Sequence, residues 1–479
     1  MIGSAADIAE KIRSGERSAV SVLLETEGLI EARNPDLNCF TAKTFARAQR
    51  EAQVIDDLRA RGRPLPPIAG VPYAVKNLFD IEGMVTLAGA RVNESNAAAA
   101  SDATVVARMR DAGAILLGAL NMEELAYGFV TENPHYGTTR NPHDRSRGAG
   151  GSSGGSAAAV GAGMVPLSLG SDTSGSIRVP ASFCGVFGLK PTYGRLPRTG
   201  TYPFVHSFDH VGPFAGTVAD LALAYDVMQG PDPLDPACAQ RELEPAAAAL
   251  TLPHGVRIGI LGGWFHEWAD PLAQRSVQLA ASALNATEWV ELESAEAARA
   301  AAFVITGAEA GALHRPRLMS RYAEFGPASR ARMVAGSLIP SSWVVQAQQV
   351  RRHAYREAMD LFERFDLLIA AAAPVVAPLV GQETLTINDR SIPTKAGLGV
   401  LTQPISCIGL PVCAVPVWPG AGTLPGSGLP IGVQLIGAPW REDLCLQAAR
   451  VLEQAGVAKV RAAGGDVSGS RQSTPARPS

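Results

Sequence analysis

The chain has 479 residues, which is enough for one large domain or two to three ordinary ones. Hydrophobic residues make up 47% and charged residues 18%, which excludes a disordered chain and predicts an ample core. The 42 Lys and Arg residues nearly balance the 45 Asp and Glu residues, so the net charge of −3 offers no basic excess for nucleic acid or an anionic membrane.

The amino-terminal segment, residues 1–68, is expected to be mainly helical. It begins without the basic flank and apolar run of a signal peptide. Apolar residues recur at helical spacing over 18–30, and Asn34-Pro35-Asp36 is expected to end that helix. A second helix is predicted from Phe45 to Arg61.

Short apolar runs then alternate with amphipathic segments through residues 69–245. Strands are predicted at 71–75, 115–117 and 165–169, and helices at 103–112 and 156–163. This alternation indicates a layered α/β sheet. We expect a single α/β/α domain over 1–463, with a central mixed, twisted sheet flanked by helices and an N-terminal helical segment.

The second half of the chain is expected to complete this sheet. Residues 234–252, rich in Pro, Ala and Glu, predict a surface connection, and the strand pattern resumes at 256–261. Residues 246–375 form a variable region that is mostly helical over 296–365, and 376–463 return to the core. Further strands are predicted at 366–370 and 412–417. The Gly-, Ser-, Pro- and Arg-rich residues 464–479 are predicted to be disordered.

Cysteine and histidine usage points to neither a disulfide framework nor a metal centre. The six cysteines are dispersed and form no CxxC pair, which favours reduced, buried thiols in a cytoplasmic protein. The eight histidines show no HExxH or other metal spacing, so structural or substrate-contact roles are expected. No apolar stretch is long enough to span a bilayer. We therefore expect no metal, no cofactor, no membrane and no nucleic acid.

One lysine stands out for its apolar surroundings at the end of a predicted strand. Lys76 is one of only six lysines in the chain. Burial would lower its pKa, and a neutral lysine can deprotonate a serine where arginine cannot. The alternative is a strand-end lysine that reaches solvent or pairs with Asp80.

Two loops rich in glycine and serine follow this lysine. The first, at 150–156, contains Ser152, and its glycines permit the unusual backbone angles that a relay serine needs; the alternative is a flexible linker. The second, at 171–178, contains Ser176 after a turn that can aim successive N–H groups at a developing negative charge. Taken alone, it would be a turn with a solvated hydroxyl.

These loops identify the chain as resembling the amidase signature hydrolases. The resemblance rests on GGSSGGS at 150–156, GSDTSGSIR at 170–178 and FCGVFGLKPT at 183–192, and runs from Ala69 to about Leu452. It implies the α/β/α amidase signature fold and a Ser–cisSer–Lys triad that works through an acyl-enzyme. Ser176 would be the nucleophile, Ser152 the relay serine on a cis peptide and Lys76 the base. The oxyanion hole would be formed by the backbone N–H groups of Thr173, Ser174, Gly175 and Ser176.

Residues around the triad also receive expected roles. Asp172 and Arg178 flank the nucleophile loop and are expected to pair and brace it. Contacts with the substrate are expected from Tyr127, Gly128 and Ser153. Many relatives carry Gly where this chain has Ser174, so dihedral strain or a narrower pocket is expected there.

Finer features are similar to the biuret/1-carboxybiuret amidohydrolase branch of this family. They include SDT at 171–173, YGRL at 193–196 and LTQPIS at 401–406. The resemblance implies a serine amidohydrolase of a small, linear ureido amide, and a homodimer or an assembly with a small accessory subunit. The pocket walls would come from residues near 300–350. Arginines at 315, 317, 351 and 352 could supply cationic groups, or could form a solvated helical face.

Other functions remain open from the sequence. One is an amidase of broader aryl amide or carbamate specificity, and another is a glutaminase-type subunit of an amidotransferase complex. A pure binding module is disfavoured by the joint presence of Lys76, Ser152 and Ser176. A GxSxG match at 151–155 would make Ser153 the nucleophile of an α/β-hydrolase, but that motif should follow a buried strand, and here it follows a polar segment.

Overall fold

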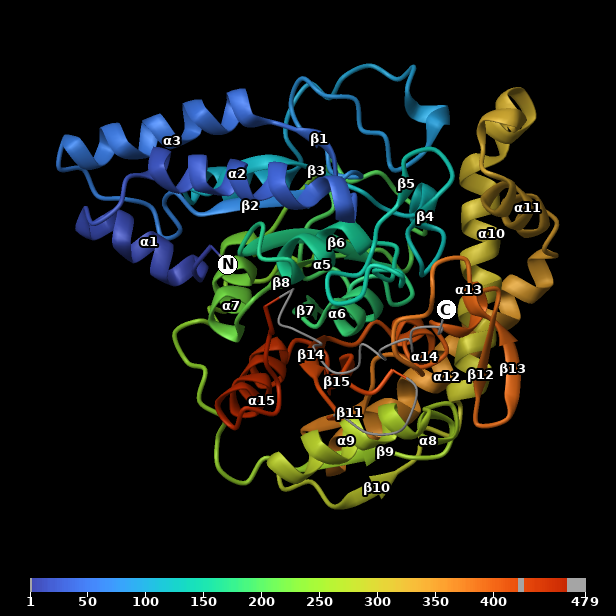
Figure 1. Cartoon of the computed structure of the whole chain (residues 1–479). Coiled ribbons are helices and arrows are strands. Elements are labelled where there is room, and N and C mark those ends of the chain that lie inside the picture. Colours follow the sequence, from blue (N-terminus) through green and yellow to red (C-terminus); the bar gives the residue numbers. More distant parts are fainter. Residues whose placement is uncertain (1, 421–425, 463–479) are drawn as a thin grey trace, which may run out of the picture.

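A mixed sheet of eleven strands runs through the centre of the molecule. Figure 1 shows the computed structural model of the chain, which describes residues 2–420 and 426–462. The strand order is β1-β3-β2-β6-β8-β7-β14-β15-β11-β9-β10. The strands are β1 (Phe40–Lys43), β2 (Pro72–Lys76), β3 (Ile115–Leu120), β6 (Leu167–Asp172), β7 (Phe187–Lys190), β8 (His210–Ala215), β9 (Ile258–Leu261), β10 (Glu288–Val290), β11 (Leu367–Ala371), β14 (Val412–Val417) and β15 (Ile431–Gly437).

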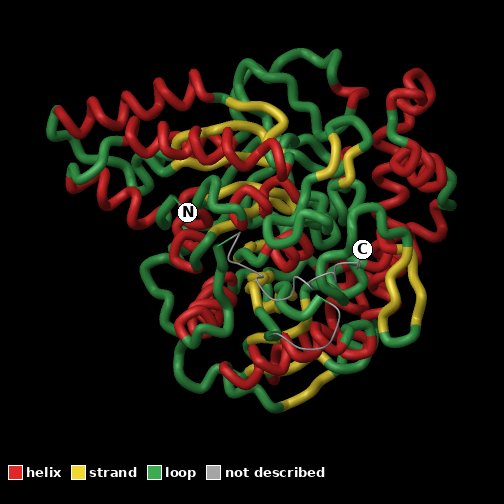
Figure 2. Tube along the Cα trace, viewed as in Figure 1, coloured by secondary structure: helices red, strands yellow, loops and turns green. Residues whose placement is uncertain are grey.

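Helices flank this sheet, as Figure 2 shows in red around the yellow strands. They are α1 (Ala5–Ser14), α2 (Ala19–Leu37), α3 (Phe45–Ala60), α4 (Thr104–Asp111), α5 (Gly154–Gly161), α6 (Arg178–Cys184), α7 (Val218–Met228), α8 (Trp264–Glu267), α9 (Pro271–Ala283) and α15 (Glu442–Gln454). Two short helices, α13 (Thr394–Gly397) and α14 (Gln403–Ile408), pack on other elements instead. α5 packs on β6 and β2, and α6 on β7, β14 and β15, while α7 packs on β8 and α15 on β14. The predicted α/β fold with a mixed sheet flanked by helices is confirmed.

Three helices stand beside the sheet, and the first two of them contribute one wall of the site described below. α10 (Ala295–Arg321) packs against α11 (Pro327–Ser337), α12 (Ser341–Arg364) and α14. They lie on the right of Figure 1, next to the hairpin of β12 (Thr384–Ile387) and β13 (Arg390–Pro393). A second small hairpin pairs β4 (Glu132–Asn133) with β5 (Gly137–Thr138). The predicted helical character of 296–365 is confirmed.

Several predicted elements match the structure closely, and others are displaced. The strand predicted at 412–417 coincides with β14, and the one at 71–75 differs from β2 by one residue at each end. The strand predicted at 165–169 lies two to three residues later, as β6. The predicted surface connection at 234–252 contains neither helix nor strand. The tail predicted to be disordered, 464–479, lies outside the described residues.

The predicted end of the first long helix is wrong. α2 continues through Pro35 to Leu37, and Asn38 ends it in the left-handed conformation with φ 53°. Pro35 removes only one backbone hydrogen bond in the last turn, and the buried side chain of Leu37 secures that turn against the core. The N–H of Asn38 then donates to the carbonyl of Asn34 at 2.7 Å.

The sheet order brings two chemically distinct residues to the same edge. β2 and β6 are parallel neighbours, with Val75 opposite Leu169. β2 ends at Lys76 and β6 at Asp172. In an open α/β sheet, ligands bind outside the carboxyl ends of such strands, so this edge is where a site is expected.

Candidate active site

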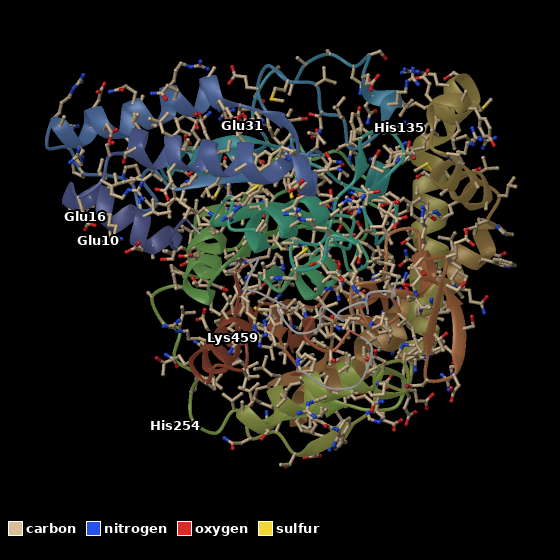
Figure 3. All side chains as sticks on the ribbon, viewed as in Figure 1. Glu10, Glu16, Glu31, His135, His254 and Lys459 are labelled. Carbon is tan, nitrogen blue, oxygen red and sulfur yellow. The ribbon has the colours of Figure 1, made fainter. Side chains whose placement is uncertain are left out.

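Lys76 is enclosed at the end of β2 by two serine hydroxyls. Its Nζ donates to Ser152 Oγ at 2.7 Å and to Ser171 Oγ at 2.8 Å. Its side chain is 0% exposed, in contrast to peripheral charged groups such as Glu10, Glu16 and Lys459, labelled in Figure 3. The alternative pairing with Asp80 is wrong, because that carboxylate accepts from Thr86 instead.

Burial determines the charge of this lysine. Loss of hydration lowers the pKa of Lys76 to about 7, although the carboxylates of Asp172 and Asp209 act in the opposite direction. A lysine with this pKa is largely neutral at and above pH 8. Its free electron pair can then take a proton from Ser152.

Ser152 belongs to the first glycine-rich loop and lies two residues before α5 begins. The peptide between Gly151 and Ser152 is cis. The Ser152 carbonyl accepts from the N–H of Glu123 at 3.1 Å. A Cβ on Gly151 would lie less than 3 Å from backbone atoms of residues 129–131. The loop is therefore packed against the segment 129–131 as well as against Glu123.

Ser176 lies in the second loop, two residues before α6 begins. It is 3% exposed, and it lines a cavity of about 530 Å³. The turn before it requires glycine, because Gly175 has φ 139° and a Cβ there would lie 2.2 Å from Thr402 Oγ1. That threonine hydroxyl donates to the carbonyl of Ser174 at 2.7 Å and fixes the turn from the opposite side.

The predicted oxyanion hole needs one correction. The N–H of Gly175 donates to Asp172 Oδ1 at 2.7 Å, so it is not free to stabilise an oxyanion. Within 2–420 and 426–462, the N–H groups of Thr173, Ser174 and Ser176 have no acceptor. Ser174 does not adopt a positive φ, so the left-handed strain expected of a side chain there does not arise.

An internal ion pair braces the nucleophile loop. Arg178 donates to both carboxylate oxygens of Asp172, from one terminal nitrogen at 2.9 Å and from Nε at 3.0 Å. Both side chains are 0% exposed. Burial alone would raise the pKa of Asp172, but Arg178 lowers it well below its usual range. The ionised carboxylate also accepts from the N–H groups of Gly175 and Ile177, so it organises the turn around Ser176.

Replacing this carboxylate by an amide is expected to destabilise the fold strongly. Asp172→Asn leaves Arg178 buried without its counter-charge, which typically costs about 3–5 kcal/mol. The matched control is Asp443→Asn, whose partner Arg441 is 45% exposed and whose pair is worth about 1 kcal/mol or less. Urea unfolding of both variants measures the difference. A loss below 1 kcal/mol for Asp172→Asn would contradict the bracing role.

The cavity beside Ser176 combines an apolar wall with two cations. Its apolar residues include Phe129, Phe204, Phe303 and Ile339, and its cations are Arg332 and Lys395. Tyr127 and Gly128 line it as well, which is consistent with the contacts expected of them. Residues 303–339 contribute eight of the lining side chains or backbones: Phe303, Thr306, Gly307, Ala328, Arg332, Ala335, Gly336 and Ile339.

One expectation about the substrate pocket is wrong, and one question that the sequence left open is decided. Ser153 is fully buried, and its hydroxyl donates to the carbonyl of Ser171 at 3.0 Å, so it is neither a substrate contact nor an exposed nucleophile. Arg315, Arg317, Arg351 and Arg352, which could have supplied cations to the pocket or formed a solvated face, do not line the cavity. Arg317 binds the Tyr202 hydroxyl at 2.7 Å, and Arg351 the Cys407 carbonyl at 2.7 Å. Arg315 and Arg352 are exposed.

The structure adds residues that the sequence did not reveal. Ser171 is a second hydroxyl on Lys76, and Arg332 and Lys395 supply the cavity's positive charge. Asp209 accepts from the Thr173 hydroxyl at 2.6 Å and so supports the same loop. Strand periodicity could have placed Ser171 beside Lys76, but no local signal points to the other three. Among the described residues, no cluster of three or more His, Cys, Asp or Glu could hold a metal ion, and no helix has both the length and the apolar character to cross a bilayer.

Comparison with known proteins gives concordant results. The family model described as Amidase matches residues 22–446. The chain is 54% identical over 457 residues to AtzE, a 1-carboxybiuret hydrolase subunit of Pseudomonas sp. (strain ADP), covering 95% of this chain and 99% of that protein. It is 37% identical over 476 residues to a subunit of the glutamyl-tRNA(Gln) amidotransferase of Synechococcus sp. (strain CC9605), covering 93% and 95%.

A solved structure is similar over nearly the whole fold. It comes from work on an unexpected vestigial protein complex that reveals the evolutionary origins of an s-triazine catabolic enzyme. The TM-score is 0.94 at 54% identity, covering 96% of this chain and 100% of that one.

Proposed function

The chain belongs to the amidase signature family, and on this premise we propose that it is a serine amidohydrolase that cleaves a C–N bond of a small ureido amide, 1-carboxybiuret or biuret. The observation that carries the proposal is the 2.7 Å contact between Lys76 Nζ and Ser152 Oγ, in a buried site beside the cavity that Ser176 lines. A neutral base, a relay hydroxyl and a second serine are the groups needed for nucleophilic catalysis without histidine.

The proposed reaction proceeds through an acyl-enzyme. Ser176 Oγ attacks the amide carbonyl while its proton passes to Ser152, and the Ser152 proton passes to neutral Lys76. The resulting oxyanion accepts hydrogen bonds from the free N–H groups of the loop, those of Thr173, Ser174 and Ser176. The C–N bond then breaks as the relay returns the proton to the leaving nitrogen. Water, deprotonated by the same relay, releases the acid from Ser176.

The relatives support the proposed substrate class and assembly. The relative with 54% identity is a 1-carboxybiuret hydrolase subunit, and a solved structure of equal identity comes from work on a protein complex. We therefore propose a small ureido substrate, and a homodimer or an assembly with a small accessory subunit. The cytoplasmic location stays a prediction.

A second candidate function is favoured by the apolar half of the cavity. Phe129, Phe204 and Phe303 would suit the ring of an aryl amide or carbamate better than they suit a small polar urea. The glutaminase alternative is favoured only by the 37% identity to a component of an amidotransferase.

A substrate comparison separates these candidates. We expect kcat/KM for ammonia release to be higher with biuret or 1-carboxybiuret than with glutamine, a fatty amide or an aryl amide. The measurement uses the purified full chain. A tenfold preference for an aryl or fatty amide, about 1.4 kcal/mol in transition-state binding, would reject the ureido assignment. Weak glutamine hydrolysis alone would favour the glutaminase-type role in an amidotransferase complex.

A further inference from the structure

Arg332 contributes an unpaired guanidinium to the cavity that Ser176 lines. It lies on α11, and its Nε donates to the carbonyl of Ala328, one turn earlier, at 3.1 Å. The guanidinium carbon lies 4.2 Å from the centre of the Tyr127 ring, which in turn packs on Phe204 with ring centres 4.8 Å apart. The side chain is therefore held in place by the cavity wall itself.

Part of this guanidinium is left without a hydrogen-bond acceptor from the protein. One terminal nitrogen of Arg332 is buried and has no hydrogen-bond partner. Across the part of the chain that the structure describes, no carboxylate forms an ion pair with Arg332. Most arginines that line a buried surface are paired, because a desolvated N–H without an acceptor is costly. An acceptor supplied by a ligand would remove this cost.

The charge of the cavity indicates that this acceptor is an anionic group of the ligand. Arg332 and Lys395 both line the cavity, and no Asp or Glu is among the described residues that do so. Glu123 is the nearby acid, but it is buried beneath Gly128, and its Oε2 accepts from the N–H of Glu132 at 3.1 Å. Glu123 interacts with Lys395 and Arg332 through its charge, but it forms no ion pair with either of them among the described residues, so the two cations still exceed the one acid. A planar guanidinium fork matches a carboxylate in shape and charge.

We propose that Arg332 binds a carboxylate of the substrate, with Lys395 adding positive charge, so that the enzyme selects anionic over neutral ureido amides. The role in turnover rests on the proposed function, whereas carboxylate binding rests on the cavity alone. Tyr127 serves as the platform that holds the guanidinium plane, a positioning residue for Arg332.

The kinetic test uses two substrates that differ by one carboxylate, 1-carboxybiuret and biuret. Arg332→Gln is expected to lower kcat/KM for 1-carboxybiuret by about 10- to 100-fold, the usual effect of one charge-assisted hydrogen bond, mainly through a higher KM. The value for biuret is expected to change less than threefold. The matched control is Arg330→Gln on the same helix, because Arg330 stacks on Tyr322 outside the cavity; it should alter neither substrate.

A binding measurement keeps this proposal separate from the proposed function. Calorimetric titration with malonate, a dicarboxylate that is not hydrolysed, should show binding to the wild-type chain and at least tenfold weaker binding to Arg332→Gln. This result supports the subsite even if neither ureido compound is turned over. Arg332→Lys, which keeps the charge and loses the fork, should lie between the two and replaces Arg332→Gln if the latter does not fold.

Two results would overturn the carboxylate assignment. One is an equal loss of kcat/KM on both substrates in Arg332→Gln with malonate binding unchanged, which would mean a structural role. The other is malonate binding that does not differ between the wild-type chain and the Arg332 variants.

Discussion

Replacement of Ser176 by alanine is expected to abolish turnover while leaving the fold intact. Loss of a catalytic nucleophile typically costs on the order of 10⁶ in rate. The side chain is small and lies at the cavity surface, and the turn around it is held by Asp172 and Thr402 rather than by its own hydroxyl. Ammonia release and thermal unfolding, measured on the same preparation, separate the catalytic loss from a folding defect.

Covalent labelling identifies the nucleophile directly. A fluorophosphonate probe should modify Ser176 in the wild-type chain and should fail to modify the Ser176→Ala variant. Ser153→Ala is the matched control, because that hydroxyl is buried and bonded to the Ser171 backbone; it should still be labelled at Ser176. Labelling at Ser153 would reject the assignment of the nucleophile.

Replacement of Lys76 is expected to have the second-largest effect. Lys76→Arg and Lys76→Met should both lose at least about 10⁴-fold in kcat/KM, since neither side chain can accept the Ser152 proton at neutral pH. Because burial lowers the pKa of Lys76 to about 7, wild-type activity should rise with pH through that value and then level off. A Lys76→Arg variant with most of its activity would show that the lysine acts only through its charge.

The same pKa shift makes a prediction for stability. In the unfolded chain the Lys76 pKa returns to about 10.5, so between pH 7 and 10.5 the unfolded state binds more protons than the folded state. The unfavourable contribution of Lys76 is therefore largest below pH 7 and declines as the pH rises toward 10.5. Lys76→Met should be more stable than wild type in urea at pH 7, and this advantage should shrink at pH 9.5.

Local sequence was sufficient to predict the parts of the site whose geometry depends on residues adjacent in the chain. The apolar run before Lys76 predicts β2 to within one residue at each end, and the glycines around Ser152 and Gly175 mark the two loops. Local sequence could not predict which acceptor the Gly175 N–H binds. That N–H donates to Asp172 and not to an oxyanion because Arg178 holds the carboxylate within its reach.

The pocket was the least predictable part for a related reason. Arg332 and Arg317 both lie in the variable region, and a pattern of charges along helices does not tell which one faces the cavity. The packing of α10 against α11 and α12 determines that Arg332 stacks on Tyr127, whereas Arg317 donates a hydrogen bond to the Tyr202 hydroxyl. Such contacts join residues that are far apart in the chain, and periodicity contains no information about them.

The partners of Arg178 also determine the order in which the site can be completed. Besides Asp172, this guanidinium donates to Thr402, Ser406 and Gln434, which follow it by 224, 228 and 256 residues. All three emerge late when the chain is synthesised from its amino terminus. A nascent chain that already contains Lys76, Ser152 and Ser176 therefore has the Asp172–Arg178 pair but lacks the later acceptors that hold Arg178. We therefore expect the loop around Ser176 to reach its final geometry only after residues 402–434 have packed on Arg178.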